Sequence, residues 1–286
     1  MVAVELIGGL GNQMFQYATA RALALSRNEN LLLDNHLFES YALHDFGLNH
    51  FNIDRSFLEI EKTVFEPLSL SNRAKAILSK REIYNLYAEK DLTFNEKLFT
   101  LQHKNIFLKG YFQSEKYFIK FEDQLRKDFE IKSPLKKQTI DFLKIIEAEN
   151  SVSLHIRRGD YVTNPEANAV HGTCDLNYYH RAIDIIKEKI DKPVFFIFSD
   201  DIDWAKENLK IDSPIYFVDF NDASTNYEDI KLMSACKHNI IANSSFSWWG
   251  AWLNANRSKT VIAPSRWFKI DIHNSKDIIP ESWMKI

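Results

Sequence analysis

The sequence predicts an α/β fold in which parallel strands alternate with crossover helices. Short apolar runs of strand length alternate with longer helical stretches along most of the 286 residues, and this alternation is typical of βαβ units. No internal repeat or low-complexity tract interrupts it. Several apolar runs end in glycines or charged residues, and open α/β folds bind ligands where their strands end.

The expected elements follow one another in a regular order. The assignment is weakest in residues 35–100, which are rich in aromatic side chains and irregular. A helix ends and a new strand begins near Ala148–Ser151, so we expect a domain of residues 1–149 followed by one of residues 150–286. The expected strands are Ala3–Ile7, Leu31–Asp34, Ile106–Lys109, Val152–Arg157, Val194–Ser199, Ile215–Val218, Asn239–Ala242 and Thr260–Ala263. The expected helices are Asn12–Ser26, Ser114–Asp128, Leu135–Glu147, Leu176–Glu188, Asp203–Asn208, Tyr227–Ala235 and Ser247–Asn254.

Composition and charge exclude several classes of protein. Hydrophobic residues make up 45% and charged residues 26% of the chain, the balance of a folded globular protein. With 36 basic and 39 acidic residues the net charge is −3, so no overall field attracts nucleic acid. Cys174 and Cys236 form neither a disulfide framework nor a metal-ligand spacing. We therefore expect a cytoplasmic protein.

Membrane insertion is not expected. The first residues lack the features of a signal peptide, and no window reaches the ~18 to 20 apolar residues of a membrane helix. The segment Ser71–Arg81 mixes basic and apolar residues at helical spacing. A solvated amphipathic helix is the commoner interpretation, and weak peripheral contact with a membrane surface is the alternative.

The first strand runs into a glycine-rich loop, Gly8-Gly-Leu-Gly-Asn-Gln-Met14. Gly9 and Gly11 permit a tight turn, and the helix that follows offers free N–H groups to an anion. The dinucleotide fingerprint is broken because its third glycine position, counted from Gly9, falls on Met14. Asn12 and Gln13 offer neutral donors and acceptors suited to sugar hydroxyls or a sugar oxygen. The alternative role of Asn12 is to cap the helix.

The run Leu154-His-Ile-Arg-Arg-Gly-Asp-Tyr161 concentrates charge at the end of a strand. The preceding residues alternate in the period of two expected for a half-buried strand, and Gly159 ends it. Arg157 and Arg158 suit an anionic group because a guanidinium can hold a phosphate at two points. Asp160 suits either orienting a guanidinium or accepting a proton from a substrate hydroxyl. A surface salt bridge that closes the turn is the alternative.

Two further strand ends carry polar side chains. Asp200 and Asp201 follow a fully apolar strand, where they suit ribose hydroxyls or a guanine N–H pair, or alternatively cap the next helix. They are adjacent, so their side chains diverge, and we expect no metal there. Asn243, Ser244 and Ser245 follow another strand and open a helix, forming a nest suited to phosphate. The tryptophans that follow are expected to lie mostly in the core.

Five motifs in this order resemble the bacterial α-1,2-fucosyltransferases, glycosyltransferase family eleven, and the resemblance spans nearly the whole chain. The motifs are Gly8-Gly-Leu-Gly-Asn-Gln-Met-Phe-Gln-Tyr17, Gly110-Tyr-Phe-Gln-Ser-Glu-Lys-Tyr117, His155-Ile-Arg-Arg-Gly-Asp-Tyr161, Phe198-Ser-Asp-Asp201 and Asn243-Ser-Ser-Phe-Ser-Trp-Trp-Gly250.

The resemblance implies a GT-B-type fold, with two Rossmann-like domains that face each other across a cleft. It implies transfer of L-fucose from GDP-β-L-fucose to the 2-hydroxyl of a terminal galactose, with inversion, without cofactor or metal. The N-terminal domain serves the acceptor and the C-terminal domain binds the donor.

The resemblance also assigns roles to single residues. Arg157 contacts the pyrophosphate in place of a metal, with His155 and Ser244 or Ser245 nearby. Asp200 or Asp201 holds the guanosine. Asn12 faces the fucose and the acceptor.

The base that deprotonates the attacking hydroxyl stays open. Asp160 is the first candidate, with Glu166 and Asp175 as alternatives. The resemblance to protein-O-fucosylating enzymes at Gly-Asn-Gln leaves room for a centre built on Asn12 without a carboxylate. A fucosyltransferase of another linkage, a GDP-sugar oxidoreductase and a non-catalytic glycan-binding protein are the competing functions.

Overall fold

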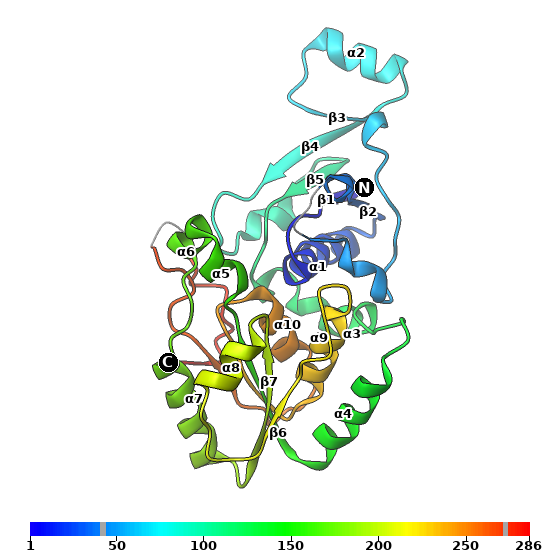
Figure 1. Ribbon diagram of the computed structural model, residues 1–286. Helices are drawn as coiled ribbons and strands as arrows, with labels where there is room; N and C mark the ends of the chain where they lie inside the picture. The colour runs from blue at the N-terminus through cyan, green and yellow to red at the C-terminus, as the bar shows by residue number, and fades with distance from the viewer. Residues whose placement is uncertain (41–43, 271–273) are drawn as a thin grey trace. The chain divides into compact units, whose positions relative to one another are not determined.

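The computed structural model describes residues 1–40, 44–270 and 274–286, and the side chain of Asp160 lies outside the described part. The chain forms two compact units (Figure 1). Unit 1 comprises Met1–Lys132 and Lys276–Ile278, and unit 2 comprises Ser133–Ser275 and Ile279–Ile286. The chain therefore returns to unit 1 near its C-terminal end.

Unit 1 contains a five-stranded sheet in the order β2-β1-β5-β4-β3. Every neighbouring pair is parallel. All four residues of β1 are buried, as expected for a short apolar strand between two neighbours. The strands are β1 (Val2–Glu5), β2 (Leu31–Asp34), β3 (Thr63–Glu66), β4 (Glu82–Ala88) and β5 (Ile106–Lys109).

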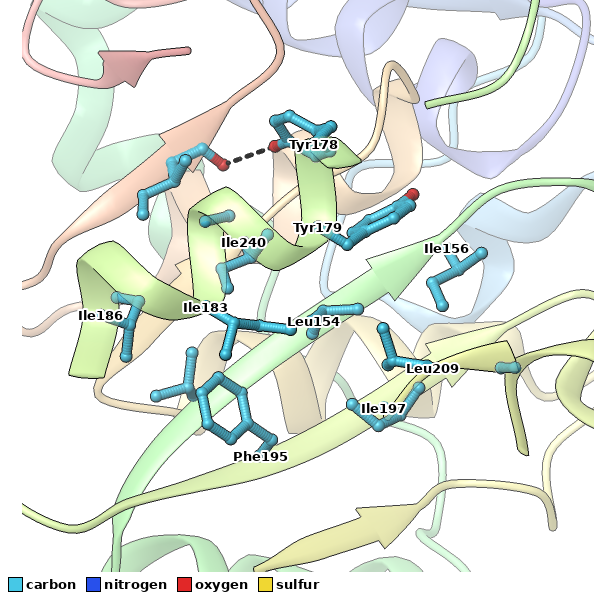
Figure 2. Close-up of a cluster of buried hydrophobic side chains, with 14 residues drawn as sticks. Leu154, Ile156, Tyr178, Tyr179, Ile183, Ile186, Phe195, Ile197, Leu209 and Ile240 are labelled. Carbon is cyan, nitrogen blue, oxygen red and sulfur yellow. Dashed lines mark hydrogen bonds between the residues drawn. The ribbon is translucent and has the colours of Figure 1, made fainter. Parts of the chain in front are cut away.

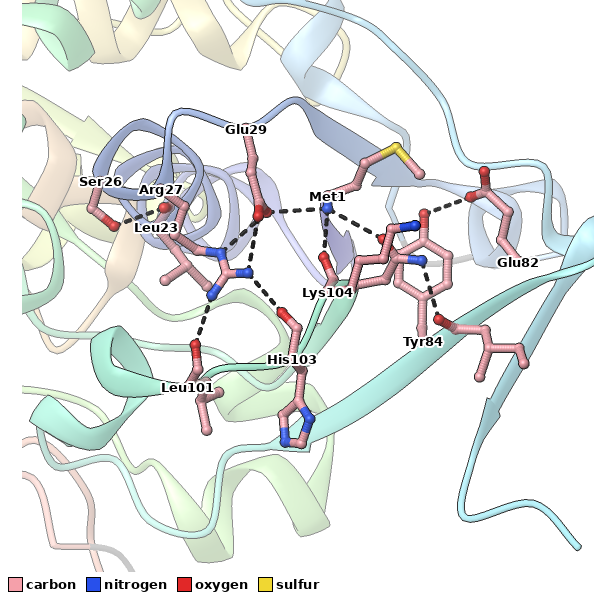
Figure 3. A network of polar contacts seen from close by, with 12 residues as sticks. Met1, Leu23, Ser26, Arg27, Glu29, Glu82, Tyr84, Leu101, His103 and Lys104 are labelled. Atoms are coloured by element: carbon pink, nitrogen blue, oxygen red, sulfur yellow. Dashed lines mark hydrogen bonds and ion pairs between the residues drawn. The ribbon is translucent and has the colours of Figure 1, made fainter. Parts of the chain in front are cut away.

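Helix α1 (Leu10–Arg27) follows β1 after the glycine-rich loop and is buried along most of its length. It ends at Asn28, whose φ of 52° is the left-handed conformation usual at a helix C-terminus. The guanidinium of Arg27 pairs with Glu29 and donates from Nη1 to the carbonyl of Leu101 at 2.7 Å (Figure 3). This network ties the end of α1 to the segment that leads into β5.

The remaining helices of unit 1 are short. They are the α-helices α2 (Leu70–Leu78) and α3 (Glu122–Asp128), and the 3₁₀ helices η1 (His36–Glu39), η2 (Gly47–His50), η3 (Ile60–Lys62), η4 (Glu96–Thr100), η5 (Glu115–Tyr117) and η6 (Ile119–Phe121).

The returning segment Lys276–Ile278 is bonded into unit 1 through Asp277. Its Oδ2 accepts a hydrogen bond from the backbone N–H of Phe94 at 2.9 Å, and its Oδ1 pairs with Nζ of Lys116 at 2.7 Å. Asp277 is 8% exposed. One carboxylate thus fixes two stretches of unit 1 that precede it by more than a hundred residues.

Unit 2 contains a six-stranded sheet in the order β11-β10-β9-β6-β7-β8, again with parallel neighbours. β6 and β7 form the longest pairing, which runs from Asn150 beside Pro193 to Ile156 beside Ser199. The strands are β6 (Asn150–Ile156), β7 (Pro193–Ser199), β8 (Ile215–Phe217), β9 (His238–Ile240), β10 (Val261–Ala263) and β11 (Met284–Lys285). The helices are α4 (Lys137–Ala148), α5 (Gly159–Thr163), α6 (Pro165–Val170), α7 (Leu176–Lys189), α8 (Ile202–Asn208), α9 (Asn226–Ala235) and α10 (Ser245–Leu253).

The core of unit 2 lies between this sheet and its helices. Figure 2 shows α7 laying Ile183 and Ile186 over Leu154 of β6 and Phe195 of β7. In α10, Trp248, Trp249 and Trp252 are at most 4% exposed, which confirms the expectation that the tryptophans belong to the core.

The predicted α/β class with parallel sheets is confirmed, and several element assignments change. The expected single helix Ser114–Asp128 is wrong: η5, η6 and α3 occupy it, because Phe118 leaves helical geometry with φ at −136°. The stretch 35–100 contains β3 and β4, which the sequence did not indicate. Their side chains are mostly half-exposed, so the apolar pattern that marks a buried strand is missing.

The expected domain junction near Ala148–Ser151 lies inside unit 2, between α4 and β6, whereas the compact units divide after Lys132. The apolar side of α4 packs on α9 and β6, both in unit 2. Where an amphipathic helix packs is set by tertiary contacts, which its sequence does not reveal. None of the helices in the described ranges is long and apolar enough to cross a bilayer.

We expect Ile186→Ala to lower the free energy of unfolding of unit 2 by about 2–5 kcal/mol, because it leaves a cavity under α7. Ile186 is fully buried. Urea denaturation followed by tryptophan fluorescence measures the change, since all six tryptophans lie in unit 2. The matched control is Ile140→Ala in α4, where the side chain is 44% exposed and the loss should stay below about 1 kcal/mol. Equal losses in both variants would contradict this account of the core.

Candidate functional site

The candidate site of unit 2 is built where β6 and β7 end side by side. The parallel register pairs Ile156 with Ser199, so the next residues, Arg157 and Asp200, emerge at the same level of the sheet. This is the carboxyl edge, where open parallel sheets bind ligands. The polar residues that the sequence places after β6 and β7 therefore lie next to each other at this edge.

Arg157 and Asp200 form an ion pair. Nη1 of Arg157 lies 2.7 Å from Oδ2 of Asp200, and each side chain is about one quarter exposed. Oδ1 of Asp200 accepts the backbone N–H of Arg158 at 2.8 Å. A Cβ atom on Gly159 would lie 2.5 Å from Oδ2 of Asp200, so a glycine is required for this approach. The carboxylate is thus held against the turn from both of its oxygens.

Arg158 is held by a second, parallel pair. Its Nε lies 3.0 Å from Oδ2 of Asp201, and its guanidinium stacks over the ring of Trp204 with Cζ 3.8 Å from the ring centroid. Oδ1 of Asp201 accepts the backbone N–H of Trp204 at 3.3 Å and caps α8. The helix-capping alternative weighed for the aspartates therefore holds for Asp201, together with the ion pair.

His155 lies under this turn on β6. It is 5% exposed, and its Nδ1 has no hydrogen-bond partner among the described residues. Burial, together with the positive charge of Arg157, lowers the pKa of His155 to about 3. The imidazole is therefore neutral at neutral pH, and it contacts the ring of Phe246 with centroids 5.8 Å apart. Within the described part of the chain, its Nδ1 is shielded from solvent as well as unpaired.

The Asn243–Ser245 segment leads from β9 into α10. Nδ2 of Asn243 donates to the carbonyls of His171, Gly172 and Trp267 at 3.1–3.2 Å, so its amide donors are committed to the protein. Ser244 is the cap of α10, its Oγ accepting the N–H of Phe246 at 3.3 Å. Ser245 is half-buried in the first turn. Asn243 thus positions the loop, while both serines lie at the helix start as expected.

The candidate bases differ in what the structure says of them. Asp160 lies in the short helix α5, and its side chain is outside the described residues. Asp175 caps α7, with Oδ1 accepting the N–H of Tyr178 at 2.8 Å. Glu166 is exposed in the first turn of α6. Of the two side chains that the structure describes, that of Asp175 is the one engaged in capping a helix.

The glycine-rich loop of unit 1 lies between β1 and α1. Gly8 has a φ of +81°, and a Cβ there would lie 2.9 Å from Nδ2 of Asn12. Gly9 is the residue before the helix and Gly11 is buried in its first turn. Oδ1 of Asn12 accepts a hydrogen bond from Nε2 of Gln113 at 2.8 Å. The structure thereby joins the first and second sequence motifs in one polar pair.

Neighbouring amides act as internal ties. Gln13 donates from Nε2 to the carbonyls of Gly8 and Asp45 at 2.8 and 2.9 Å, and its Oε1 accepts the N–H of Gly47 at 2.9 Å. Gln16 is likewise bonded, with Oε1 accepting the N–H of Ile7 at 3.0 Å. These bonds fix the loop. Gln13 and Gln16 are buried, whereas the side chain of Asn12 is half-buried and partly accessible.

Sequence reasoning missed Glu89. Its carboxylate accepts the backbone N–H groups of Tyr111 and Phe112 at 2.7 and 3.0 Å, which holds Phe112 at a φ of 52° and orients Gln113 next to it. Burial raises the pKa of Glu89 despite these bonds. The positive φ of a phenylalanine is not readable from sequence. The signal that was available is Gly110, whose missing Cβ lets Glu89 approach.

No group of three or more His, Cys, Asp or Glu side chains that could hold a metal ion occurs among the described residues.

Solved structures of low sequence identity share the fold. The chain superposes on POFUT1 in complex with GDP-fucose with a TM-score of 0.54 and 14% identity, covering 92% of this chain and 97% of that one. It superposes on a mutant of Arabidopsis thaliana FUT1 in complex with GDP with a TM-score of 0.52 and 12% identity, covering 92% and 70%. These likenesses confirm the expected GT-B-type fold class of two Rossmann-like units.

Sequence comparison identifies the family. An Escherichia coli alpha-1,2-colitosyltransferase is 39% identical over 290 residues, covering 100% of this chain and 99% of the relative. The Escherichia coli O-antigen biosynthesis glycosyltransferase WbnK is 37% identical, covering 98% and 99%. The galactoside alpha-(1,2)-fucosyltransferase 2 of Rattus norvegicus is 26% identical, covering 88% and 67%. The model of the family described as Glycosyl transferase family 11 matches residues 1–286, and the chain belongs to that family.

Proposed function

We propose that this glycosyltransferase moves L-fucose from GDP-β-L-fucose to the 2-hydroxyl of a terminal galactose, with inversion at the anomeric carbon. The rat relative, named as a galactoside alpha-(1,2)-fucosyltransferase, supports the donor sugar and the linkage. The relative named for O-antigen biosynthesis supports a surface polysaccharide as the acceptor. The acceptor then ends in galactose and the products are the α-1,2-fucosylated glycan and GDP.

The two arginines that follow β6, each paired with an aspartate that follows β7, are the observation that carries the proposal. During transfer the bond between the anomeric carbon and the β-phosphate oxygen breaks, and its electron pair stays on the departing GDP. The attacking galactose oxygen bonds to the anomeric carbon and gives up its proton. A guanidinium fixed beside the phosphate stabilises the developing charge more than the ground state. Arg157 is the leaving-group clamp, and Arg158 and the start of α10 at Ser244–Ser245 assist it.

The aspartates act in this proposal chiefly through the arginines. Asp200 and Asp201 hold one guanidinium each before the donor arrives, so that little reorganisation is needed when the pyrophosphate binds. Each carboxylate oxygen has a second lone pair and can accept another hydrogen bond. Asp200 or Asp201 therefore also contacts the guanosine. His155, neutral and buried, contacts the donor or supports the strand end that carries Arg157.

The acceptor side rests on unit 1 in this proposal. Asn12, oriented by Gln113, contacts the transferred sugar and the acceptor, and Gly9 and Gly11 allow close approach of the loop. Asp160 is the proposed base, with Glu166 as the alternative. Asp175 is less suited because its carboxylate caps α7. The oxocarbenium-like centre requires only modest assistance from a base.

Colitosyl transfer is the second candidate function. The colitosyltransferase relative is 39% identical over the full chain, more than the rat fucosyltransferase at 26%. Colitose is L-fucose without the 3-hydroxyl. A site that hydrogen-bonds this hydroxyl rejects the deoxy sugar by roughly 10⁴-fold or more, whereas a site that does not bond it discriminates weakly.

A fucose-specific site that hydrogen-bonds the 3-hydroxyl should favour GDP-fucose over GDP-colitose in kcat/KM by roughly 10⁴-fold. The measurement uses both donors with a panel of galactosides, including lactose and N-acetyllactosamine, and NMR to read the linkage of the product. A preference for GDP-colitose would overturn the assignment of fucose as the donor sugar, although the protein would still be a glycosyltransferase. A linkage other than 1,2 would overturn the acceptor assignment.

Arg157→Ala should lower kcat by roughly 100- to 1000-fold or more, because the charge that stabilises the leaving GDP is lost. Arg157→Lys should recover part of the activity, since it keeps the charge and loses the fork. Arg181→Ala, on an exposed position of α7, is the matched control and should leave turnover unchanged. Circular dichroism checks that each variant is folded. Near-normal turnover in folded Arg157→Ala would remove this residue from the mechanism.

We expect transfer to persist in excess EDTA, because the proposed clamp on the pyrophosphate is a guanidinium rather than a divalent cation. Initial rates with and without chelator test this after dialysis of the protein against EDTA. A loss of turnover that magnesium or manganese restores would assign a metal to the donor site and displace Arg157 from its role.

A further inference from the structure

Helix α2 exposes its apolar side chains instead of burying them. Leu70 is 89% exposed, Ile77 64% and Leu78 84%. Of the nine residues of α2, all of them described, Ala76 is the buried one, and α2 packs on β4. Large aliphatic side chains this open are unusual together, although single ones are common on protein surfaces.

The exposed apolar residues share one face of the helix. Leu70, Ala74, Ile77 and Leu78 follow the spacing i, i+4, i+7 and i+8, which places them in one stripe. Ala76 lies on a different side of the helix, about 100° from the nearest of them at Ile77. The face that meets unit 1 is therefore not the apolar face. The stripe can become buried only if it binds another surface.

Basic side chains surround this stripe. Arg73, Lys75, Lys80 and Arg81 lie in α2 or directly after it, and no Asp or Glu occurs in residues 67–81. Arg73 pairs with Glu66, while Lys75, Lys80 and Arg81 are exposed. An apolar stripe flanked by lysine and arginine is the pattern of a helix that lies in the interface of an anionic membrane.

The helix keeps its shape with little support from the rest of unit 1. Oγ of Ser69 caps its start by accepting the N–H of Asn72 at 3.3 Å. Its end turns at Lys80, with a φ of 55°, and the N–H of Arg81 returns to the carbonyl of Ala76 at 2.8 Å. In Figure 1 α2 projects beyond the ends of β3 and β4, on the two chain segments that join it to them. Within unit 1, α2 therefore makes few contacts and packs only its Ala76 side against the sheet.

We propose that α2 docks unit 1 on an anionic lipid surface, with Leu70, Ile77 and Leu78 entering the headgroup region and Lys75, Lys80 and Arg81 meeting lipid phosphates. A second copy of the chain fits less well, because a symmetric contact would bring like charges together. The stripe has three large side chains, whereas a stable protein interface takes about 20–30 residues from each partner. The docking does not depend on which sugar is transferred.

Flotation with vesicles of phosphatidylglycerol and phosphatidylethanolamine tests the docking with the full chain. We expect the protein to float with these vesicles and to remain behind with phosphatidylcholine vesicles. Raising the salt concentration should release it. The variant Leu70→Gln/Ile77→Gln/Leu78→Gln should lower the partition coefficient more than roughly tenfold. Lys75→Gln/Lys80→Gln/Arg81→Gln should do the same through lost lipid attraction.

Ile140→Gln, which changes an exposed isoleucine of α4, is the matched control and should float like the unchanged protein. Both triple variants should keep their kcat on a soluble galactoside, which separates docking from catalysis and from misfolding. Failure of the unchanged protein to float would overturn the proposal, as would equal flotation of the apolar variant. Sedimentation velocity adds one more outcome: self-association that the apolar variant abolishes, without flotation, would assign α2 to a contact between copies.

Discussion

The register between β6 and β7 is the constraint on which the candidate site depends. Because Ile156 lies beside Ser199, each of the next two arginines meets an aspartate from the neighbouring strand end. Half-exposed ion pairs of this kind add little to the stability of a fold, commonly below about 1 kcal/mol each. Their main effect is to position the two arginine side chains in one arrangement. The guanidinium of Arg158 is also stacked on Trp204. A slip of one residue between the strands would turn both arginines to the wrong faces.

Much of this region was predictable from the sequence. The strands β6 and β7 are strongly patterned, and the idea that polar residues at their ends share one edge follows from parallel topology alone. The pairing of Arg157 with Asp200 was not predictable. Among the described residues, the carboxylate of Asp200 on the adjacent strand pairs with Arg157, although it lies far from Arg157 along the chain. Pairing across a sheet depends on which strands become neighbours, and a single sequence carries little information on that order.

In unit 1, the sequence pattern does not reveal several elements and contacts. β4 buries one residue of its seven, Tyr84, so it lacks the apolar run by which strands are recognised. The contact between Asn12 and Gln113 joins segments about a hundred residues apart through neutral amides, which carry no distinctive periodicity. Gln13 and Asn243 resemble ligand-binding side chains in sequence, yet the structure commits their amides to backbone carbonyls. Amide side chains serve both purposes with the same atoms, and only their surroundings distinguish the two.

The contacts of Asp277 have a consequence for engineering and for evolution by recombination. Unit 1 is not a continuous stretch of sequence, since the carboxylate that binds Phe94 and Lys116 arrives after nearly all of unit 2. A fragment that stops at Lys132 would lack that carboxylate. A chimera joining residues 1–132 of this chain to the remainder of a relative would take the residue at this position from the other parent. Exchange of the two halves between family members therefore keeps the bonds to Phe94 and Lys116 only where the incoming tail also supplies a carboxylate.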